Sequence, residues 1–394
     1  MKYKAFEEFY REAKIKHLML IEFDGYLVSP PFCTDKCKDY SNVMIIKEGE
    51  VSYIKVDTSP ATSKYSGYAI IGDSLWFIPY GIWDDFNVVL QLKKVPGGLE
   101  PIHHTINKPG KGQFYNMDTD SKTAFSFPLG YEGTNFCLYI KDDQVHTIDF
   151  EQQPYLKLHM GTVYCNGRYW SPPRSEGGTG PGYINMMSFD GETITNYPIN
   201  VKHPEVTRKY SDMVVQGNTL WALPFGEQPG LTEVLEFDTT TNTYQLHELN
   251  VPDFAKKYNC MVVVGDYIIG LPYGTKDENG SNIGVRFNML DKTSVPFSIG
   301  PEYTFGGKYR FRSGLNYNGR AVFFPSGTPT CPIMSVGEAL DIETKYIEGV
   351  LFGRPIMFNG KIVALGYKLT DHSLSMYTFE EDLTYTTFFI TDYA

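Results

Sequence analysis

The sequence lacks the segments that mark membrane, secreted and nucleic-acid-binding proteins. No run of 18 apolar residues occurs, and a membrane-spanning helix needs one. The first twenty residues, MKYKAFEEFYREAKIKHLML, carry acidic residues where a signal peptide has an apolar core. We therefore expect a cytoplasmic protein that makes no membrane contact. The formal net charge of −11 also disfavours nucleic acid as a partner, because phosphate backbones are bound by basic patches.

Motifs for metals, phosphates and common catalytic centres are scarce as well. Among the six cysteines only Cys33 and Cys37 are close in sequence, and no second Cys or His pair has zinc-site spacing. The scattered cysteines are typical of reduced thiols. There is no Gly-x-Ser-x-Gly or His-Glu-x-x-His motif, and GGTGPG (177–182) lacks the Gly-Lys-Ser/Thr of a phosphate-binding loop. We expect no metal ion and no cofactor.

What the sequence does contain is a repeat. Three eighteen-residue stretches agree in register: KYSGYAIIGDSLWFIPYG (64–81), KYSDMVVQGNTLWALPFG (209–226) and KYNCMVVVGDYIIGLPYG (257–274). Each begins with Lys-Tyr, has a glycine eight residues later and ends in Pro-x-Gly. Weaker copies place a proline after an apolar run every 44 to 53 residues, and an eighth copy, GKIVALGY (360–367), keeps the glycine without the proline.

Each repeat unit contains four short apolar or alternating runs separated by Gly- or Asp-containing turns, as expected for a meander of four strands. The aromatic content of 15% also favours strands. A repeated four-stranded unit of this length is the signature of a β-propeller blade. We predict an all-β fold, a single β-propeller domain over 16–394 with eight four-stranded blades, or seven if one segment is misread.

The first fifteen residues lie outside the repeats. Phe6, Tyr10 and Ala13 fall at i, i+4 and i+7, which predicts a short N-terminal amphipathic helix over 1–15. We expect this helix to cap one face of the propeller or to seal the ring.

The order of a glycine turn, an aromatic-rich strand and a Phe-Asp-x-x-Thr stretch, as in FDTTTNT (237–243), resembles kelch-like β-propeller repeat proteins. The resemblance covers 17–394 and concerns architecture. It implies blades stacked around a central axis, with the first strand of each blade lining a channel.

That architecture brings the two ends of the repeat together on one face, where propellers usually bind ligands. Basic or aromatic residues stand before the first strand of every blade. We predict that they form a ligand site on this face: Lys64, Tyr65, Tyr115, His159, Lys209, Tyr210, Lys257, Tyr258, Lys308, Tyr309 and Arg354. The alternative is structural: tyrosines packed between blades, with lysines lying along them.

The loops between the second and third strands add further candidates at the rim: Trp83, Asp84, Glu132, Arg174 and Glu227. Cations suit an anionic ligand, and tyrosine faces suit a sugar. We predict a binding protein for a small polar, anionic or sugar-like ligand, or for a peptide.

Two alternative functions are left open. One is a carbohydrate-active hydrolase or lyase that uses two rim carboxylates as general acid and base, drawn from Asp84, Asp85, Glu132, Glu176 and Glu227. The sequence does not say which of these would be catalytic. The other is a scaffold for a protein partner, which requires an exposed apolar patch on one face.

Overall fold

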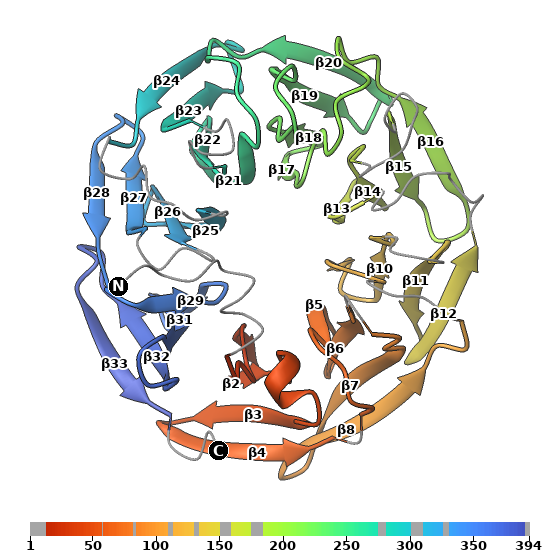
Figure 1. The fold of residues 1–394 in the computed structure, drawn as a ribbon. Coiled ribbons are helices and arrows are strands. Elements are labelled where there is room, and N and C mark those ends of the chain that lie inside the picture. Colours follow the sequence, from red (N-terminus) through yellow and green to blue (C-terminus); the bar gives the residue numbers. More distant parts are fainter. Residues whose placement is uncertain are drawn as a thin grey trace.

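Short strands joined by tight turns pair with their neighbours in sequence and build a ring of sheets (Figure 1). The structure is a computed structural model and describes residues 13–56, 58–81, 84–108, 113–129, 134–149, 159–174, 184–274, 281–300, 310–325 and 331–390. Within these ranges eight antiparallel sheets are formed, each a blade whose strands run in chain order from the axis to the perimeter. The eight-bladed propeller is therefore confirmed, and the seven-bladed alternative is wrong.

The first four blades take up the N-terminal half of the chain. Blade 1 consists of β1 (Ile21–Phe23), β2 (Tyr26–Ser29), β3 (Asn42–Lys47) and β4 (Glu50–Lys55). Blade 2 consists of β5 (Tyr65–Ile71), β6 (Ser74–Pro79), β7 (Val88–Val95) and β8 (Gly98–Thr105). Blade 3 consists of β9 (Asp118–Thr119), β10 (Thr123–Ser126), β11 (Phe136–Lys141) and β12 (Gln144–Asp149). Blade 4 consists of β13 (Val163–Cys165), β14 (Arg168–Ser171), β15 (Asn185–Phe189) and β16 (Ile194–Pro198).

The other four blades follow in the same way. Blade 5 consists of β17 (Val214–Gln216), β18 (Thr219–Ala222), β19 (Glu233–Asp238) and β20 (Thr243–Glu248). Blade 6 consists of β21 (Tyr258–Val264), β22 (Tyr267–Pro272), β23 (Ile283–Asn288) and β24 (Ser294–Ser298). Blade 7 consists of β25 (Phe311–Tyr317), β26 (Arg320–Pro325), β27 (Ile333–Gly337) and β28 (Ile342–Lys345). Blade 8 consists of β29 (Val350–Phe352), β30 (Ile356–Phe358), β31 (Lys361–Lys368), β32 (Leu374–Phe379) and β33 (Tyr385–Phe389).

The glycine that recurs within the repeat makes the turn between the first two strands. Gly72, Gly217 and Gly265 have φ values of +54°, +60° and +57°. Left-handed backbone of this kind is what a two-residue hairpin turn requires, and glycine adopts it without a steric penalty. The turn fixes the register of the hairpin and thereby decides which face of each strand is buried.

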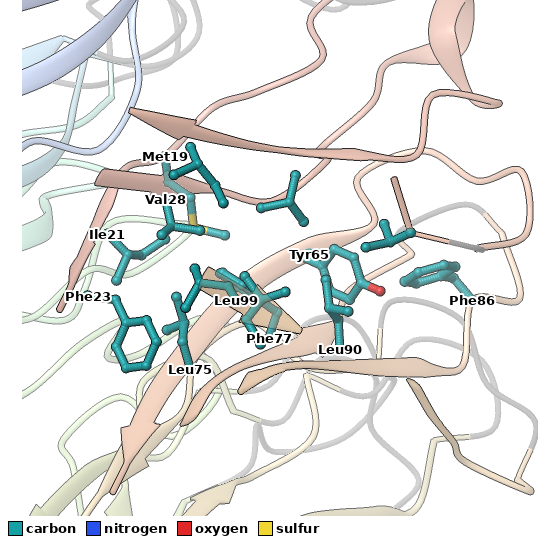
Figure 2. Packing of buried hydrophobic residues seen from close by; sticks show 14 of the residues in the cluster. Met19, Ile21, Phe23, Val28, Tyr65, Leu75, Phe77, Phe86, Leu90 and Leu99 are labelled. Carbon is teal, nitrogen blue, oxygen red and sulfur yellow. The ribbon is translucent and has the colours of Figure 1, made fainter. Parts of the chain in front are cut away.

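The core lies between the blades. Eight hydrophobic clusters are formed, one at each interface between neighbouring blades. Figure 2 shows the interface of blades 1 and 2, where Ile21 and Val28 face Leu75, Phe77 and Leu90. Both faces of a blade are covered, so the second strand of blade 2, β6, is buried at every position. Perimeter strands such as β4 and β20 alternate between exposed and half-buried residues because their outer edge meets water.

Among the described residues, the ring closes at the interface between blade 8 and blade 1, and each of these two sheets consists of strands that are consecutive in sequence. Ala13 and Ile15 are buried in the cluster shared by these two blades, and Met19 pairs with Arg354 in a parallel bridge. Most of the expected N-terminal helix, 1–12, lies outside the described residues, and 13–15 are not helical. In the described part of the chain the one helical element is the 3₁₀ turn η1 (Asp35–Cys37), and no helix there has the length and apolar character needed to span a membrane.

Candidate functional site

Backbone hydrogen bonds join the two ends of the eighteen-residue repeat. The amide that follows each proline donates to the carbonyl of the lysine that opens the same copy: Tyr80 to Lys64, Phe225 to Lys209 and Tyr273 to Lys257, each at 2.8 Å. The same residues reach the next blade, because the Lys257 amide donates to the Phe225 carbonyl at 2.7 Å. The ends of the repeat therefore meet at one edge of each blade, as the architecture predicted.

The lysine side chains of the repeat are buried and do not face a ligand. Lys64, Lys209 and Lys257 are fully buried. The Lys209 ammonium donates to the carbonyls of Pro204 and Val206, both at 2.8 Å. Burial lowers the pKa of all three lysines, and that of Lys209 falls to about 8. This corrects the expectation that these lysines point into the channel.

The other two buried lysines are bonded in the same way. Lys64 donates to the Tyr40 carbonyl at 2.9 Å and to the Thr58 hydroxyl at 3.0 Å. Lys257 lies 3.0 Å from a carboxylate oxygen of Asp253 and also donates to the Phe254 carbonyl. Each ammonium thus forms hydrogen bonds with the part of the chain that precedes its own blade, and these bonds compensate for the lost hydration of the charge.

The tyrosines of the repeat are buried between blades. Tyr65, Tyr210 and Tyr258 are fully buried. Tyr65 packs edge-on against Phe86 with ring centroids 5.2 Å apart, as Figure 2 shows. The Tyr210 hydroxyl donates to the Glu233 carbonyl at 3.1 Å. The ligand-facing role predicted for these tyrosines is corrected as well, and the structural alternative accounts for them.

Two further candidates are buried in structural contacts. His159 is 1% exposed, and its Nδ1 lies 2.9 Å from the Ser171 hydroxyl. Burial lowers the pKa of His159 to about 3, so the ring is neutral at pH 7. Arg174 is also buried and donates to the Ser211 hydroxyl at 2.9 Å. We therefore do not count either residue among the groups that can meet a ligand directly.

The described rim acids hold loops in place. Asp84 accepts hydrogen bonds from the amide and the hydroxyl of Thr62, at 2.7 and 2.8 Å. Glu227 pairs with Arg208 at 2.8 Å and with Lys256 at 3.4 Å. The two acids belong to the rims of blades 2 and 5, so the structure does not bring them together as a catalytic pair.

Five of the predicted site residues lie outside the described residues: Trp83, Glu132, Glu176, Lys308 and Tyr309. In blade 7 the position of the Lys-Tyr pair is taken by Arg310 and Phe311, because the Arg310 amide donates to the Tyr273 carbonyl at 3.1 Å. The two residues are fully buried like the lysines and tyrosines of the repeat.

The remaining candidates, Tyr115 and Arg354, meet at the ring axis together with Arg312, which the sequence reading missed. The guanidinium carbon of Arg312 lies 5.3 Å from the centre of the Tyr115 ring, and that of Arg354 lies 5.9 Å from it. Tyr115 precedes the first strand of blade 3, whereas Arg312 belongs to blade 7 on the opposite side of the ring in Figure 1. Side chains from opposite blades can touch only across the axis. The charge of Arg354 also acts on the carboxyl of Asp212. We call these four residues, Tyr115, Arg312, Arg354 and Asp212, the axial cluster.

Local irregularities of the innermost strands place the members of this cluster. Arg312 sits in a register shift between Phe311 and Ser313 of β25. Arg354 lies in the break between β29 and β30, which both pair with β31. A bulge re-aims the side chain that it carries, which is why bulges are common beside functional sites. Arg312 directly follows the buried pair Arg310 and Phe311, and Ser66 and Asn259 hold the corresponding position in blades 2 and 6, where the same register shift occurs.

Tyr115 does not occupy the position of the repeat tyrosine between the blades, because Phe114 takes that position. Gln113 and Phe114 donate to the carbonyls of Tyr80 and Pro79, at 2.9 and 3.2 Å. These are the bonds that the Lys-Tyr pair makes in other blades, so Tyr115 comes one position after the buried aromatic residue. Its ring contacts Tyr80 edge-on at 5.7 Å, which places it near the Pro-x-Gly edge of blade 2.

Two acids lie close to each other, and the charge of Arg354 acts on one of them, Asp212. Burial raises the pKa of Asp212 to about 6, although the Met213 amide and the charge of Arg354 act in the opposite direction. Gly161 of blade 4 allows the Asp212 carboxylate to lie there, since a Cβ on Gly161 would be 2.9 Å from it. Burial likewise raises the pKa of Asp118, which accepts the amides of Thr119 and Tyr164 at 2.9 and 2.6 Å.

The arginines act on the phenol of Tyr115. Burial by itself would raise the pKa of Tyr115, but the charges and hydrogen bonds of Arg312 and Arg354 outweigh it and lower that pKa. The cluster therefore joins two cationic groups, a phenol with a lowered pKa and a carboxyl with a pKa of about 6. Such perturbed groups gather at functional sites more often than elsewhere. Within the described ranges, no group of three or more His, Cys, Asp or Glu side chains could hold a metal ion.

Comparison with known proteins supports the fold. No protein-family description matches the chain, and no curated protein matches it. The solved structure of BamB from Moraxella catarrhalis is similar with a TM-score of 0.56 at 10% identity, over 97% of this chain and 96% of that one. Apo AztD from Citrobacter koseri gives 0.54 at 10% identity, over 94% and 92% of the two chains. Virginiamycin B lyase from Staphylococcus aureus gives 0.53 at 12% identity, over 76% and 91%. These likenesses establish the propeller architecture, whereas membership of a kelch-like family stays a prediction.

Proposed function

We propose that the protein binds a small anionic ligand, or the acidic group of a sugar or peptide, at the axial cluster. The observation that carries this proposal is the convergence of Arg312 and Arg354 on Tyr115 from three different blades. The proposal keeps the binding function expected from the sequence, but places the site at the ring axis and not at the lysines of the repeat.

Charge is the reason to expect an anion. The chain carries 46 acidic and 35 basic residues, so two arginines at the axis form a local positive site in a negative molecule. A carboxylate or phosphate oxygen about 4 Å from a guanidinium gains about 4 kcal/mol at an effective dielectric constant of about 20, before the cost of desolvation. Guanidinium groups also bind carboxylates and phosphates through paired hydrogen bonds, which adds geometric selectivity.

A thermal-shift screen tests the proposal. The purified protein is heated with sugar phosphates, uronic acids, nucleotides and neutral oligosaccharides, because a ligand that binds the folded state raises the melting temperature. We expect acidic probes to raise it and neutral oligosaccharides to leave it unchanged. Arg312→Gln and Arg354→Gln should each weaken binding of the best probe about 10- to 100-fold, the value of a charged hydrogen bond.

Arg286→Gln is the matched control. Arg286 also lies over a tyrosine ring, 4.6 Å from the centre of Tyr267, but it belongs to β23, away from the innermost strands. This variant should bind the probe like the wild-type protein. A probe that binds equally well to Arg312→Gln, or a response to neutral sugars only, would contradict the proposed site.

The same cluster favours an enzyme as the second candidate. Asp212, with a pKa of about 6, can accept and return a proton near that pH, and the lowered pKa of Tyr115 makes its phenol a better proton donor than a free tyrosine. If a probe that binds is also turned over, Asp212→Asn should abolish turnover while binding persists. Turnover that survives in Asp212→Asn would refute this role.

A further inference from the structure

The pair Cys33 and Cys37 lies outside the axial cluster and is unused by the proposed function. Both thiols are free; Cys37 is the last residue of the 3₁₀ turn η1 after β2, and Cys33 lies two residues before the turn begins. Cys37 is half-buried, whereas Cys33, Cys137, Cys165, Cys260 and Cys331 are buried. Cys37 is therefore the cysteine that a reagent in solution can reach.

The backbone brings the two sulfur atoms together. The Thr34 amide donates to the Cys37 sulfur at 3.3 Å. Because this amide nitrogen is bonded to the carbonyl carbon of Cys33, the Cys37 sulfur lies at most about 6 Å from the Cys33 Cα. The Cys33 thiol donates to the Tyr40 carbonyl at 3.2 Å, and the Cys37 thiol donates to the Ile15 carbonyl at 3.3 Å. Cys33 itself has a left-handed backbone with φ of 66°, unusual for a residue other than glycine.

The surroundings of the pair are cationic. The Lys64 ammonium shares the Tyr40 carbonyl with the Cys33 thiol and lies 2.9 Å from that oxygen. The Lys16 ammonium lies 4.8 Å from the centre of the Tyr40 ring, and its charge acts on both thiols. Hydrogen bonding by Cys33, the bonds from Thr34 and the charge of Lys16 lower the pKa of Cys37 to about 6, against the effect of burial. The hydrogen bond to Cys37 and burial raise the pKa of Cys33.

We propose that Cys37 and Cys33 form a thiol–disulfide exchange site that reacts with low-molecular-weight disulfides. Cys37 is the attacking thiolate and Cys33 the resolving thiol. Low-pKa, accessible cysteines beside a second thiol are the ones that react in this way.

The exchange balances in two steps. The Cys37 thiolate attacks one sulfur of a disulfide RSSR, forms a Cys37–S–S–R mixed disulfide and expels RS⁻. The Cys33 sulfur, whose proton passes to the expelled thiolate, then attacks the Cys37 sulfur and releases a second RS⁻. The two cysteines are oxidised to one disulfide, and RSSR is reduced by two electrons to two thiols.

The experiment uses the full-length native protein and oxidised glutathione as the probe. After the reaction, free thiols are alkylated and the protein is digested with trypsin. Lys36 lies between the two cysteines, so cleavage places them on separate peptides that stay joined only if the disulfide has formed. We expect a linked Cys33–Cys37 peptide pair from the wild-type protein. Folded protein that yields no linked pair would overturn the proposal.

Single variants separate the two roles. Cys33→Ser should accumulate a stable glutathione adduct on Cys37, because no resolving thiol is left. Cys37→Ser should leave Cys33 unmodified, because Cys33 is buried. Cys331→Ser, which changes a buried cysteine of blade 7, is the control and should behave like the wild-type protein. An adduct on Cys33 in the Cys37→Ser variant would contradict the assignment.

A measurement on the wild-type protein does not depend on whether these variants fold. Iodoacetamide alkylation, quantified for each cysteine by mass spectrometry, should modify Cys37 at least about tenfold faster than the buried Cys137 and Cys165. Equal rates at the three sites would show that reaction follows unfolding, and the proposal would fail.

Discussion

Replacing Lys209 with methionine tests whether the lysines of the repeat are structural. The Lys209 ammonium is fully buried and is held by two carbonyls at 2.8 Å. Burial lowers its pKa from 10.5 to about 8. A buried charge of this kind makes the free energy of unfolding depend on pH, whereas an exposed lysine lining a channel would not.

The sign of the dependence follows from proton counts. Below pH 8 Lys209 is protonated in both the folded and the unfolded protein and contributes no slope. Between pH 8 and 10.5 the unfolded chain binds a proton that the folded protein has released, so the free energy of unfolding rises with pH. At about 1.36 kcal/mol per pH unit above pH 8, the gain between pH 7.5 and pH 9.5 is about 2 kcal/mol.

Urea unfolding of wild type and Lys209→Met at these two pH values measures the effect. The difference between wild type and variant should shift by about 2 kcal/mol in favour of the wild type at the higher pH, because contributions from other groups cancel. Lys94→Met is the control, since Lys94 is exposed and pairs with Asp24 at the surface. A difference that is the same at both pH values would refute the burial of a charged Lys209.

Three further predictions concern stability. Tyr210→Phe should lower the free energy of unfolding by about 1 kcal/mol, because the hydrogen bond of its hydroxyl is lost. Tyr65→Phe should be neutral or stabilising, because within the described residues that buried hydroxyl has no hydrogen-bond partner. Urea unfolding of both variants tests this difference. Gly353→Ala should lower the free energy of unfolding by about 3 kcal/mol, since the added Cβ would lie 1.8 Å from the Leu18 carbonyl oxygen. Gly72→Ala, with open space around the added Cβ, should lower it by about 1 kcal/mol. Equal losses of Tm in the two variants would contradict this prediction. The pKa of His159 is about 3 in the folded protein and 6.5 in the unfolded chain, so the free energy of unfolding falls as the pH drops through this window. From pH 7 to pH 5 the wild type should lose about 2 kcal/mol more of this free energy than His159→Gln. Parallel pH profiles of the two proteins would refute the prediction.

The fold was predictable because each blade is specified locally. The turn glycines, the alternating runs and the prolines recur in most units, and each serves a hairpin that forms within about fifty residues. The closure of the ring was less accessible to sequence reading. It depends on Ala13 and Ile15 packing at the interface of blades 8 and 1, a contact across almost the whole chain.

The site was harder to predict because residues that recur from blade to blade serve the packing of the blades, whereas a ligand site does not have to recur. Lys209 and Tyr210 recur in other blades since every blade must tie down its entering segment and fill the gap to its neighbour. A ligand site at the axis needs different side chains from different blades. Arg312 and Tyr115 both directly follow the buried aromatic residue, at the position that Ser66 holds in blade 2, so they depart from the repeat in residue type.

The sequence by itself determined the propeller class, the four-stranded meander and the meeting of the two repeat ends, because these depend on local turns and on side-chain periodicity, whereas the structure decided for eight blades over seven. The tertiary structure alone decided which polar residues are buried and which meet at the axis. The buried Lys64 is held by the Tyr40 carbonyl and the Thr58 hydroxyl of the preceding segment, and the contact of Arg312 with Tyr115 spans opposite blades. The first contact forms only when adjacent blades pack together, and the second only when the ring closes.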